Sequence, residues 1–349
     1  MKLISIDGSY GEGGGQILRT AIALSAVTNT PVEIKNIRAN RPNPGIKAQH
    51  YTALRIVKEL CNAETEGLEI GSHRVFFNPG EFRGGSYKFD IGTAGSIVLV
   101  CQACLLAAVR TTKPITLYLK GGTDVKWSPS WDYFTHVFLP LLRRIGVEVE
   151  TRLIRRGYYP EGGGEAEIRI QPVDKLKPIK LEDFRECRKV EGIIHVTNLP
   201  EHIGRRMKHS AVKVFVNKGM DARINVETGS SRSTGTGITV WTTCEGIHLG
   251  KTMLGEKGVP AEEVGRRAAE ELISELSAKP TVDVNLFDQL IPYMVLANGG
   301  EKSVCRVREI SKHADTCMWL VSKFFDGEDL FKVEKTGETY RVEAVGRGL

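Results

Sequence analysis

The chain has 349 residues, which is more than a single hydrophobic core usually holds, so more than one folding unit is expected. Its 41% hydrophobic and 26% charged residues are ordinary for a globular protein, and no apolar run approaches the roughly 20 residues that a membrane span needs. The net charge of +6 permits a polyanionic partner without requiring one, and it does not separate nucleic acid from a small phosphorylated substrate.

Apolar periodicity predicts the same order of elements three times along the chain. The first copy, over residues 2–78, is predicted as strand, helix, strand, helix and a closing hairpin with strands at 66–71 and 74–78. The second repeats this order over 86–172, with its second helix at 131–146. The third begins with a strand at 178–183 and resumes with a helix at 288. Each copy therefore has the order βαβαββ, which predicts an α/β fold whose three layers share one central helical core.

The third copy is interrupted by a stretch that is too long for a loop and has its own pattern of strands and helices. An inserted α/β domain is therefore predicted at 184–278, and the main domain is predicted to comprise 1–183 and 279–349. The basic residues of its first predicted helix indicate a solvated face first and a nucleic-acid face second: Arg205, Arg206, Lys208 and Lys213.

The seven cysteines are an odd number spread singly along the chain, which suits a reducing compartment better than a disulfide framework. Cys101 and Cys104 form a CxxC pair in an apolar predicted helix, where buried structural thiols are expected rather than zinc or redox chemistry. The first residues become polar too quickly for a signal peptide. We therefore expect a cytoplasmic protein with no membrane partner.

The most informative stretch is a glycine-rich turn that runs from Gly8 into the predicted helix containing Arg19. Glycines allow positive φ and let a ligand approach backbone N–H groups, and the N-terminus of the following helix favours anions. Glu12 would repel a bare phosphate, so it is best interpreted as a metal ligand or as a partner for arginines. The alternative is a plain turn between a strand and a helix.

A second polar cluster surrounds a proline-rich loop that follows the second predicted strand. Arg38 and Arg41 flank this loop, and Gln49 and His50 lie in the first turns of the next predicted helix. Guanidinium groups suit phosphate oxygens, and ligands favour crevices at strand ends in α/β folds. The cluster therefore indicates phosphate recognition, with a surface loop of scattered charges as the alternative.

A third cluster lies in the last predicted copy. The segment Asn285–Gln289 occupies the start of a predicted helix, and Gln102 lies on the matching helix of the second copy. His313 stands at the start of the following helix. A neutral imidazole there could act as base, metal ligand or nucleophile, whereas a lone histidine is more often a solvated or core residue.

With these residues assembled, the chain resembles the RNA 3′-terminal phosphate cyclase family. The motifs that carry the resemblance are Gly8–Arg19, Ile37–Pro42, Gln49–His50, Ile91–Ser96, Gly121–Asp124, Tyr158–Gly164, Asp288–Gln289 and His313. The resemblance implies three repeats similar to the C-terminal domain of a bacterial translation initiation factor, with a smaller inserted domain. One departure is Cys317, which follows Thr316 where family members are expected to have asparagine.

The resemblance also implies an activity, namely the ATP-dependent conversion of an RNA 3′-terminal phosphate to a 2′,3′-cyclic phosphate. The implied route passes through a covalent histidyl-AMP and an RNA-adenylate anhydride, and it releases pyrophosphate and AMP. A non-catalytic, RNA-binding relative in ribosome biogenesis is the alternative, but that branch should lack the histidine. A small-molecule transferase would explain the repeats and not the histidine.

The resemblance assigns a role to each matching residue. His313 would be the nucleophile, and Glu12 would serve a divalent metal, Mg²⁺ or Mn²⁺. The residues implied to hold ATP are Gln102, Asn285, Leu286, Phe287, Asp288 and Gln289. Those implied to receive the RNA 3′-phosphate end are Arg19, Arg38, Arg41, Gln49 and His50. This account requires the His313 ring to lie beside Glu12 in the folded chain.

Overall fold

The computed structural model describes residues 2–325 and 329–348, and it contains four four-stranded sheets among them. The N-terminal sheet has the strand order β1 (Ile4–Asp7), β2 (Val32–Lys35), β4 (Val75–Asn78), β3 (Glu64–Glu66), with helices α1 (Gly15–Thr28) and α2 (Ala48–Leu60) between its strands in sequence. β1 and β2 are parallel, whereas β4 is antiparallel to both of its neighbours. Burial alternates along β1, which places Ile4 and Ile6 in the core.

The second sheet has the order β5 (Gly85–Asp90), β6 (Ile115–Gly121), β8 (Gly164–Ile170), β7 (Val149–Arg155). Its first helix is α3 (Ile97–Ala108), and the next helical segment consists of α4 (Trp131–Tyr133), the π-helical turn η1 (Phe134–Phe138) and α5 (Leu139–Arg144). A single helix was predicted over 131–146. The π-helical turn ends two residues before Pro140, which has no N–H with which to continue an α-helical ladder.

The third sheet has the order β9 (Lys180–Leu181), β14 (Lys302–Val307), β16 (Thr339–Val345), β15 (Phe331–Thr336), with helices α8 (Val284–Leu296) and α9 (Lys312–Phe324). The three sheets share one topology when their strands are counted along the chain. The first strand is parallel to the second, the second is antiparallel to the fourth, and the third lies at the edge beside the fourth.

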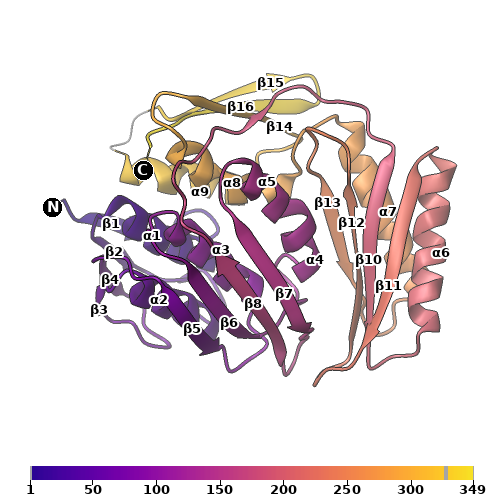
Figure 1. The fold of residues 1–349 in the computed structure, drawn as a ribbon, viewed down its shortest axis with the longest axis horizontal. Helices are drawn as coiled ribbons and strands as arrows, with labels where there is room; N and C mark the ends of the chain where they lie inside the picture. Colours follow the sequence, from indigo (N-terminus) through magenta and orange to yellow (C-terminus); the bar gives the residue numbers. More distant parts are fainter. Residues whose placement is uncertain (1, 326–328, 349) are drawn as a thin grey trace.

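The helices of these three units pack against one another. α1 contacts α3 and α9, and α8 contacts α9 and α3, so that one hydrophobic cluster runs through all three units. Figure 1 shows α8 and α9 beneath the third sheet, on the side that faces α1 and α3. The mixed α/β architecture predicted from the sequence is confirmed.

The fourth sheet lies within the segment predicted to be an insertion, and Figure 1 shows it beside the other three, with α6 and α7 on its outer side. Its elements are β10 (Lys189–Thr197), α6 (His202–Asn217), β11 (Asp221–Gly229), β12 (Gly235–Thr242), β13 (Gly250–Leu254) and α7 (Ala261–Ser277). The strand order is β11-β10-β12-β13, and the segment has a hydrophobic cluster of its own. The domain boundaries at 184 and 278 stay a prediction.

A disulfide joins Cys187 and Cys244, with 5.6 Å between their Cα atoms. The expectation of a chain without disulfides is therefore wrong for this pair. β10 and β12 are antiparallel, with Val190 opposite Thr242, so the register brings the two cysteines together at the end of the ladder although 57 positions separate them in sequence. The predicted cytoplasmic location stays a prediction.

The other cysteines are buried free thiols, Cys101 and Cys104 in α3 among them, as predicted. Within residues 2–325 and 329–348, no helix is long and apolar enough to cross a bilayer.

Candidate active site

The glycine-rich turn between β1 and α1 packs directly against helix α9. Gly11 and Gly13 have φ values of +56° and +55°, a region that side chains with a Cβ rarely adopt. A Cβ on Gly11 would lie 2.3 Å from Oγ1 of Thr316, which is in the second turn of α9. Glycine is therefore required at Gly11 for the close approach as well as for the turn, and this approach places the turn against α9.

His313 lies in the first turn of α9, where the Ser311 hydroxyl accepts a hydrogen bond from the Ala314 N–H and caps the helix. Its Nε2 is 3.0 Å from Oε2 of Glu12, and its Nδ1 is 2.7 Å from Oε1 of Gln16. The expected proximity of this ring to the glycine turn is confirmed. The side chain of His313 is 47% exposed and lines the pocket, so a ligand can reach the ring.

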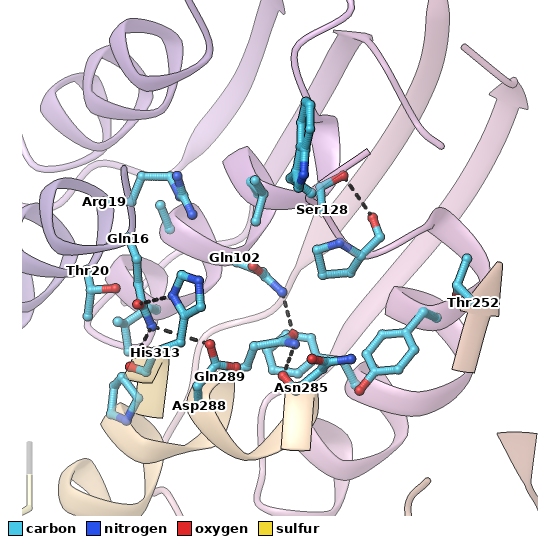
Figure 2. Close-up of a pocket in the computed structure, with 18 of the residues that line it drawn as sticks. Gln16, Arg19, Thr20, Gln102, Ser128, Thr252, Asn285, Asp288, Gln289 and His313 are labelled. Carbon is cyan, nitrogen blue, oxygen red and sulfur yellow. Dashed lines mark hydrogen bonds between the residues drawn. The ribbon is translucent and has the colours of Figure 1, made fainter. Parts of the chain in front are cut away.

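The amide of Gln16 determines which nitrogen of His313 carries a proton. The Gln16 amide nitrogen donates to Oδ2 of Asp288 at 3.4 Å and to the His313 carbonyl at 3.3 Å, so its oxygen faces Nδ1. Nδ1 is therefore the donor. Nε2 faces the Glu12 carboxylate, which accepts its proton when the ring is charged; when the ring is neutral, Nε2 presents a lone pair. Figure 2 shows the contacts of Gln16 with His313 and Asp288.

Gln16, Asp288 and His313 line a cavity of about 410 Å³. Figure 2 shows Gln16 and Arg19 on one side of it, and Asn285, Asp288 and Gln289 of α8 on another. The amide of Gln102 in α3 donates to Gln289, whose own amide donates to the Asn285 carbonyl. The remaining lining includes the loop 127–129 and residues of the inserted segment, namely Lys251, Thr252 and Glu271.

The structure does not bring every predicted residue to this cavity. Leu286 and Phe287 are completely buried in the hydrophobic core, with their side chains behind the first turn of α8. Arg38, at φ +56°, donates to the carbonyls of Asn43 and Gly45 at 2.7 and 3.0 Å, so its guanidinium holds its own loop together. We therefore expect these three residues to support the site rather than to contact a ligand through their side chains.

The side chain of Gln49 is also engaged within the protein. Its Oε1 accepts a hydrogen bond of 2.7 Å from the N–H of Ser96, the residue immediately before α3. In contrast, Arg41 lies beside the glycine turn, with Nη2 3.5 Å from Oε2 of Glu12. His50 is buried against Gly15, where a Cβ would lie only 2.0 Å from its Nε2. Burial and the neighbouring Arg19 lower the pKa of His50 to about 3, which keeps that ring neutral.

Two features that shape the site were not predicted from the sequence. The loop after β6 places Trp127, which is 95% exposed and has a φ of +61°, at the mouth of the cavity together with Pro129. No sequence signal indicated this loop. Asp283 is the N-cap of α8, a helix that was predicted to begin at 288. An aspartate before an apolar helix is a recognised N-cap signal, so this residue could have been found.

A sequence model of the family described as RNA 3'-terminal phosphate cyclase matches residues 10–329. The chain belongs to this family. Curated relatives that carry that same name include a protein of Pyrococcus furiosus, 49% identical over 93% of both chains, and one of Methanopyrus kandleri, 45% identical over 93% of this chain and 94% of the other. A third, from Methanosarcina acetivorans, is 43% identical over 97% of this chain and 99% of the other.

The enolpyruvyl transferase NikO from Streptomyces tendae is a solved structure with 10% identity and a TM-score of 0.38, which aligns with all of this chain and 49% of its own. That likeness is too weak to carry an argument. Membership of the cyclase family also makes Cys317 notable, since asparagine was expected there. Its thiol is buried in α9, and burial together with the charge of Asp288 raises its pKa well above the ordinary value.

Asp288 makes the stability of this cyclase-family protein depend on pH. Burial and the charge of Asp283 raise the pKa of Asp288 to about 7, against the lowering effect of Arg19. The folded chain therefore holds a proton that the unfolded chain releases near pH 4, so stability is expected to fall as pH rises from about 4 to about 7.

Urea unfolding at several pH values checks this expectation for Asp288. The Asp288→Asn variant should lack this part of the pH dependence, so that its stability relative to the wild type rises by up to about 1.4 kcal/mol per pH unit in the window. Parallel stability profiles of the two proteins between pH 4 and 7 would contradict the assignment.

Proposed function

We propose that this protein converts RNA 3′-terminal phosphates to 2′,3′-cyclic phosphates at the expense of ATP, through a covalent histidyl-AMP. The observation that carries the proposal is the position of His313, between Glu12 and Gln16 at the rim of a cavity lined by polar groups. The curated relatives that cover nearly the whole chain are named RNA 3'-terminal phosphate cyclase, which supports the same activity here.

The first step is a nucleophilic substitution at the α-phosphorus of ATP. The Nε2 lone pair of His313 forms the new N–P bond while the bond between the α-phosphorus and its bridging oxygen breaks, and pyrophosphate leaves. Gln16 holds the proton on Nδ1 throughout, which keeps Nε2 as the reacting nitrogen. Glu12 lies 3.0 Å from Nε2 and can accept the proton that a charged ring must lose first.

The cavity beside His313 is the place proposed for the nucleotide. Its volume of about 410 Å³ lies within the range of roughly 300–1,000 Å³ that is usual for small-molecule sites. Asn285, Gln289 and Gln102 offer amide groups there, and Asp288 offers a carboxyl group, so the ribose and the base would find both donors and acceptors. Arg19 lies on the same wall and suits a phosphate.

A divalent metal ion, Mg²⁺ or Mn²⁺, is proposed to accompany ATP. Glu12 fits this role, since Mg²⁺ is commonly held by one or two carboxylates together with substrate phosphates and water. Nη2 of Arg41 lies 3.5 Å from Oε2 of Glu12, so the guanidinium partly offsets the negative charge of this carboxylate. The ion would supply neutralisation of the triphosphate charge.

The later steps need a site for the RNA terminus next to the adenylate. Arg41 and the free N–H groups at the start of α1 are proposed to receive the 3′-phosphate, because both favour anions. An oxygen of that phosphate attacks the adenylate phosphorus and breaks its bond to His313. The neighbouring 2′-hydroxyl then attacks the RNA phosphorus, which closes the ring and expels AMP.

We further propose that the three sheets with the same strand order are copies of one βαβαββ unit, similar to the C-terminal domain of a bacterial translation initiation factor. The shared order, with the same parallel and antiparallel pairs, supports this proposal. Each unit supplies a helix to the cavity, and these are α1, α3 and α8.

The alternative of a non-catalytic RNA-binding factor is disfavoured by one observation. Such a protein has no need for an imidazole whose Nδ1 is fixed by one side chain and whose Nε2 faces a carboxylate. In a binding module, His313 would be replaceable without a chemical consequence.

The experiment that tests the proposal is self-labelling with α-labelled ATP and Mg²⁺ or Mn²⁺. The wild type should acquire one acid-labile label per chain, and His313→Ala should acquire none, because the label is an N–P bond to this ring. His209→Ala is the matched control, since His209 is an exposed histidine on α6 and its loss should leave labelling unchanged. Covalent label on His313→Ala would overturn the assignment.

A further inference from the structure

A buried cluster of charged groups lies between the second unit and the inserted segment, and none of its members lines the cavity described above. Asp124 follows β6, Asp132 is in α4 and His195 is in β10, and each is at most 2% exposed. One ligand atom from each of the three lies within 4.8 Å of the others. Arg156 and Glu227 complete the cluster.

Two atoms of the cluster have no hydrogen-bond partner. These are Nε2 of His195 and Oδ2 of Asp132, both fully buried. A buried polar atom without a partner costs roughly 1–3 kcal/mol, so two in one place call for an explanation. Oδ1 of Asp124 lies 3.6 Å from Nε2 of His195 and accepts a hydrogen bond of 3.4 Å from the Trp131 N–H.

The surroundings fix the orientation of the imidazole ring of His195. Nδ1 is 2.9 Å from the Tyr158 hydroxyl, and that hydroxyl is 2.9 Å from Oγ1 of Thr197. When Nδ1–H donates to Tyr158 and Tyr158 donates to Thr197, Nε2 carries a lone pair, 3.6 Å from Oδ1 of Asp124. A histidine held through its other nitrogen in this way is characteristic of metal sites.

Arg156 binds one oxygen of each carboxylate, and of the other two oxygens Oδ2 of Asp132 has no hydrogen-bond partner. Its guanidinium donates to Oδ2 of Asp124 at 3.2 Å and to Oδ1 of Asp132 at 2.9 Å. It also contacts Glu227, whose side chain is 52% exposed. Two buried carboxylates against one guanidinium leave a net negative charge, which a cation would offset.

We propose that Asp124, Asp132 and His195 bind a divalent transition-metal ion, with Zn²⁺ as the best fit, which joins the inserted segment to the main body. The imidazole ligand disfavours Mg²⁺ and Ca²⁺, which take oxygen ligands. Zn–N and Zn–O bonds of about 2.0–2.2 Å separate two ligands of one tetrahedral ion by about 3.4 Å. The 3.6 Å between His195 and Asp124 matches this separation.

The site is distinct from the one proposed at Glu12, because its ligands come from other elements and neither Glu12 nor His313 belongs to the group. Its ligands also come from both parts of the chain, since β10 belongs to the inserted segment whereas Asp124 and Asp132 do not. Zn²⁺ bound there would act on the stability of the assembled chain, whether or not the protein transfers AMP.

The test is equilibrium dialysis of the full-length, EDTA-treated protein against micromolar Zn²⁺, with metal counted per chain. One equivalent is expected for the wild type, together with a rise in Tm. Tyr158→Phe keeps the aromatic ring and removes the partner of Nδ1, so Zn²⁺ affinity should fall by about 10–100-fold. The Asp132→Asn variant keeps an oxygen that can accept from Arg156. It should bind no Zn²⁺ at this site, and Zn²⁺ should no longer raise its Tm.

Two control variants separate this site from its neighbours. Glu227→Gln alters a contact of Arg156 that is not a ligand, and Glu12→Gln alters the proposed catalytic metal position; both should keep the Zn²⁺ equivalent. A wild type that binds no Zn²⁺, or Tyr158→Phe and Asp132→Asn proteins that bind it as the wild type does, would overturn the proposal. The same dialysis against Mn²⁺ should give weaker binding.

Discussion

The Asp283→Ala variant is expected to lose about 4 kcal/mol or more of folding free energy, an unusually large effect for one side chain. The carboxylate of Asp283 is completely buried and accepts from four donors. Two are the N–H groups of Asn285 and Leu286 at 3.0 Å, which cap α8. The others are the Tyr133 hydroxyl, at 2.8 Å, and the Gly250 N–H, at 3.0 Å.

This carboxylate joins three parts of the molecule, because Tyr133 is in the second unit, Gly250 is in the inserted segment and α8 lines the cavity. Its removal leaves three buried donors and the part-buried Asn285 N–H unpaired, and each buried donor costs roughly 1–3 kcal/mol before relaxation. The start of α8, which presents Asn285 and Asp288, also becomes loose. We therefore expect weaker ATP binding as well as lower stability.

Urea unfolding and ATP binding check the expectation for Asp283. Ser96→Ala is the matched control, because Ser96 is also a buried N-cap but accepts a single bond, from the Leu99 N–H, and should cost about 1 kcal/mol. The loss of folding free energy for Asp283→Asn should lie between those of the other two variants. Its amide oxygen can still accept hydrogen bonds, but its NH₂ group would face donors and cannot accept from them. Equal losses for Asp283→Ala and Ser96→Ala would show that the link between the three parts contributes nothing.

The second large effect is expected from Gly11→Ala, which should lower stability by about 2–4 kcal/mol and abolish most self-labelling. The new methyl group would lie 2.3 Å from Oγ1 of Thr316, and the φ of +56° adds roughly 1 kcal/mol. The turn and α9 must then move apart. That movement separates Glu12 from the ring of His313.

A double-mutant cycle isolates the steric part of this effect. With Thr316→Ala the nearest remaining atom to the new methyl is the Cβ at residue 316, 3.5 Å away, so the double variant should recover stability and labelling. Gly337→Ala is the control for backbone conformation, because Gly337 has a φ of +63° with no atom within 4 Å of its Cβ position. Strictly additive losses for Gly11→Ala and Thr316→Ala would contradict the proposed close approach.

Local sequence signals were sufficient for the type and order of the elements. The apolar run that becomes α3 and the alternation in β1 depend on residues only a few positions apart, so periodicity finds them. Boundaries were less accurate. α8 begins at Val284 rather than 288, and the strand predicted at 66–71 is β3 (Glu64–Glu66), followed by glycines with positive φ at 67 and 71.

The candidate site followed from residue types that are rare in such positions. A glutamate within a glycine turn and a histidine at the start of a helix can be singled out by their chemical groups before the fold is known. The structure brings these two residues, Glu12 and His313, together. Side-chain direction was not predictable in the same way. Leu286 and Asn285 are neighbours in sequence, yet the first is buried in the core and the second lines the cavity, because successive residues of a helix face different sides.

The sequence by itself therefore determined the element types, the order of the units and the chemical groups of the site, since these depend on residues close together in the chain. The tertiary structure alone decided which groups meet. Gln16 and His313 are 297 positions apart, and Cys187 and Cys244 are 57 apart. The buried links through Asp283 and Arg156 likewise join distant elements. Such pairs form only when helices pack and strands take their register, and neither process has a local signal.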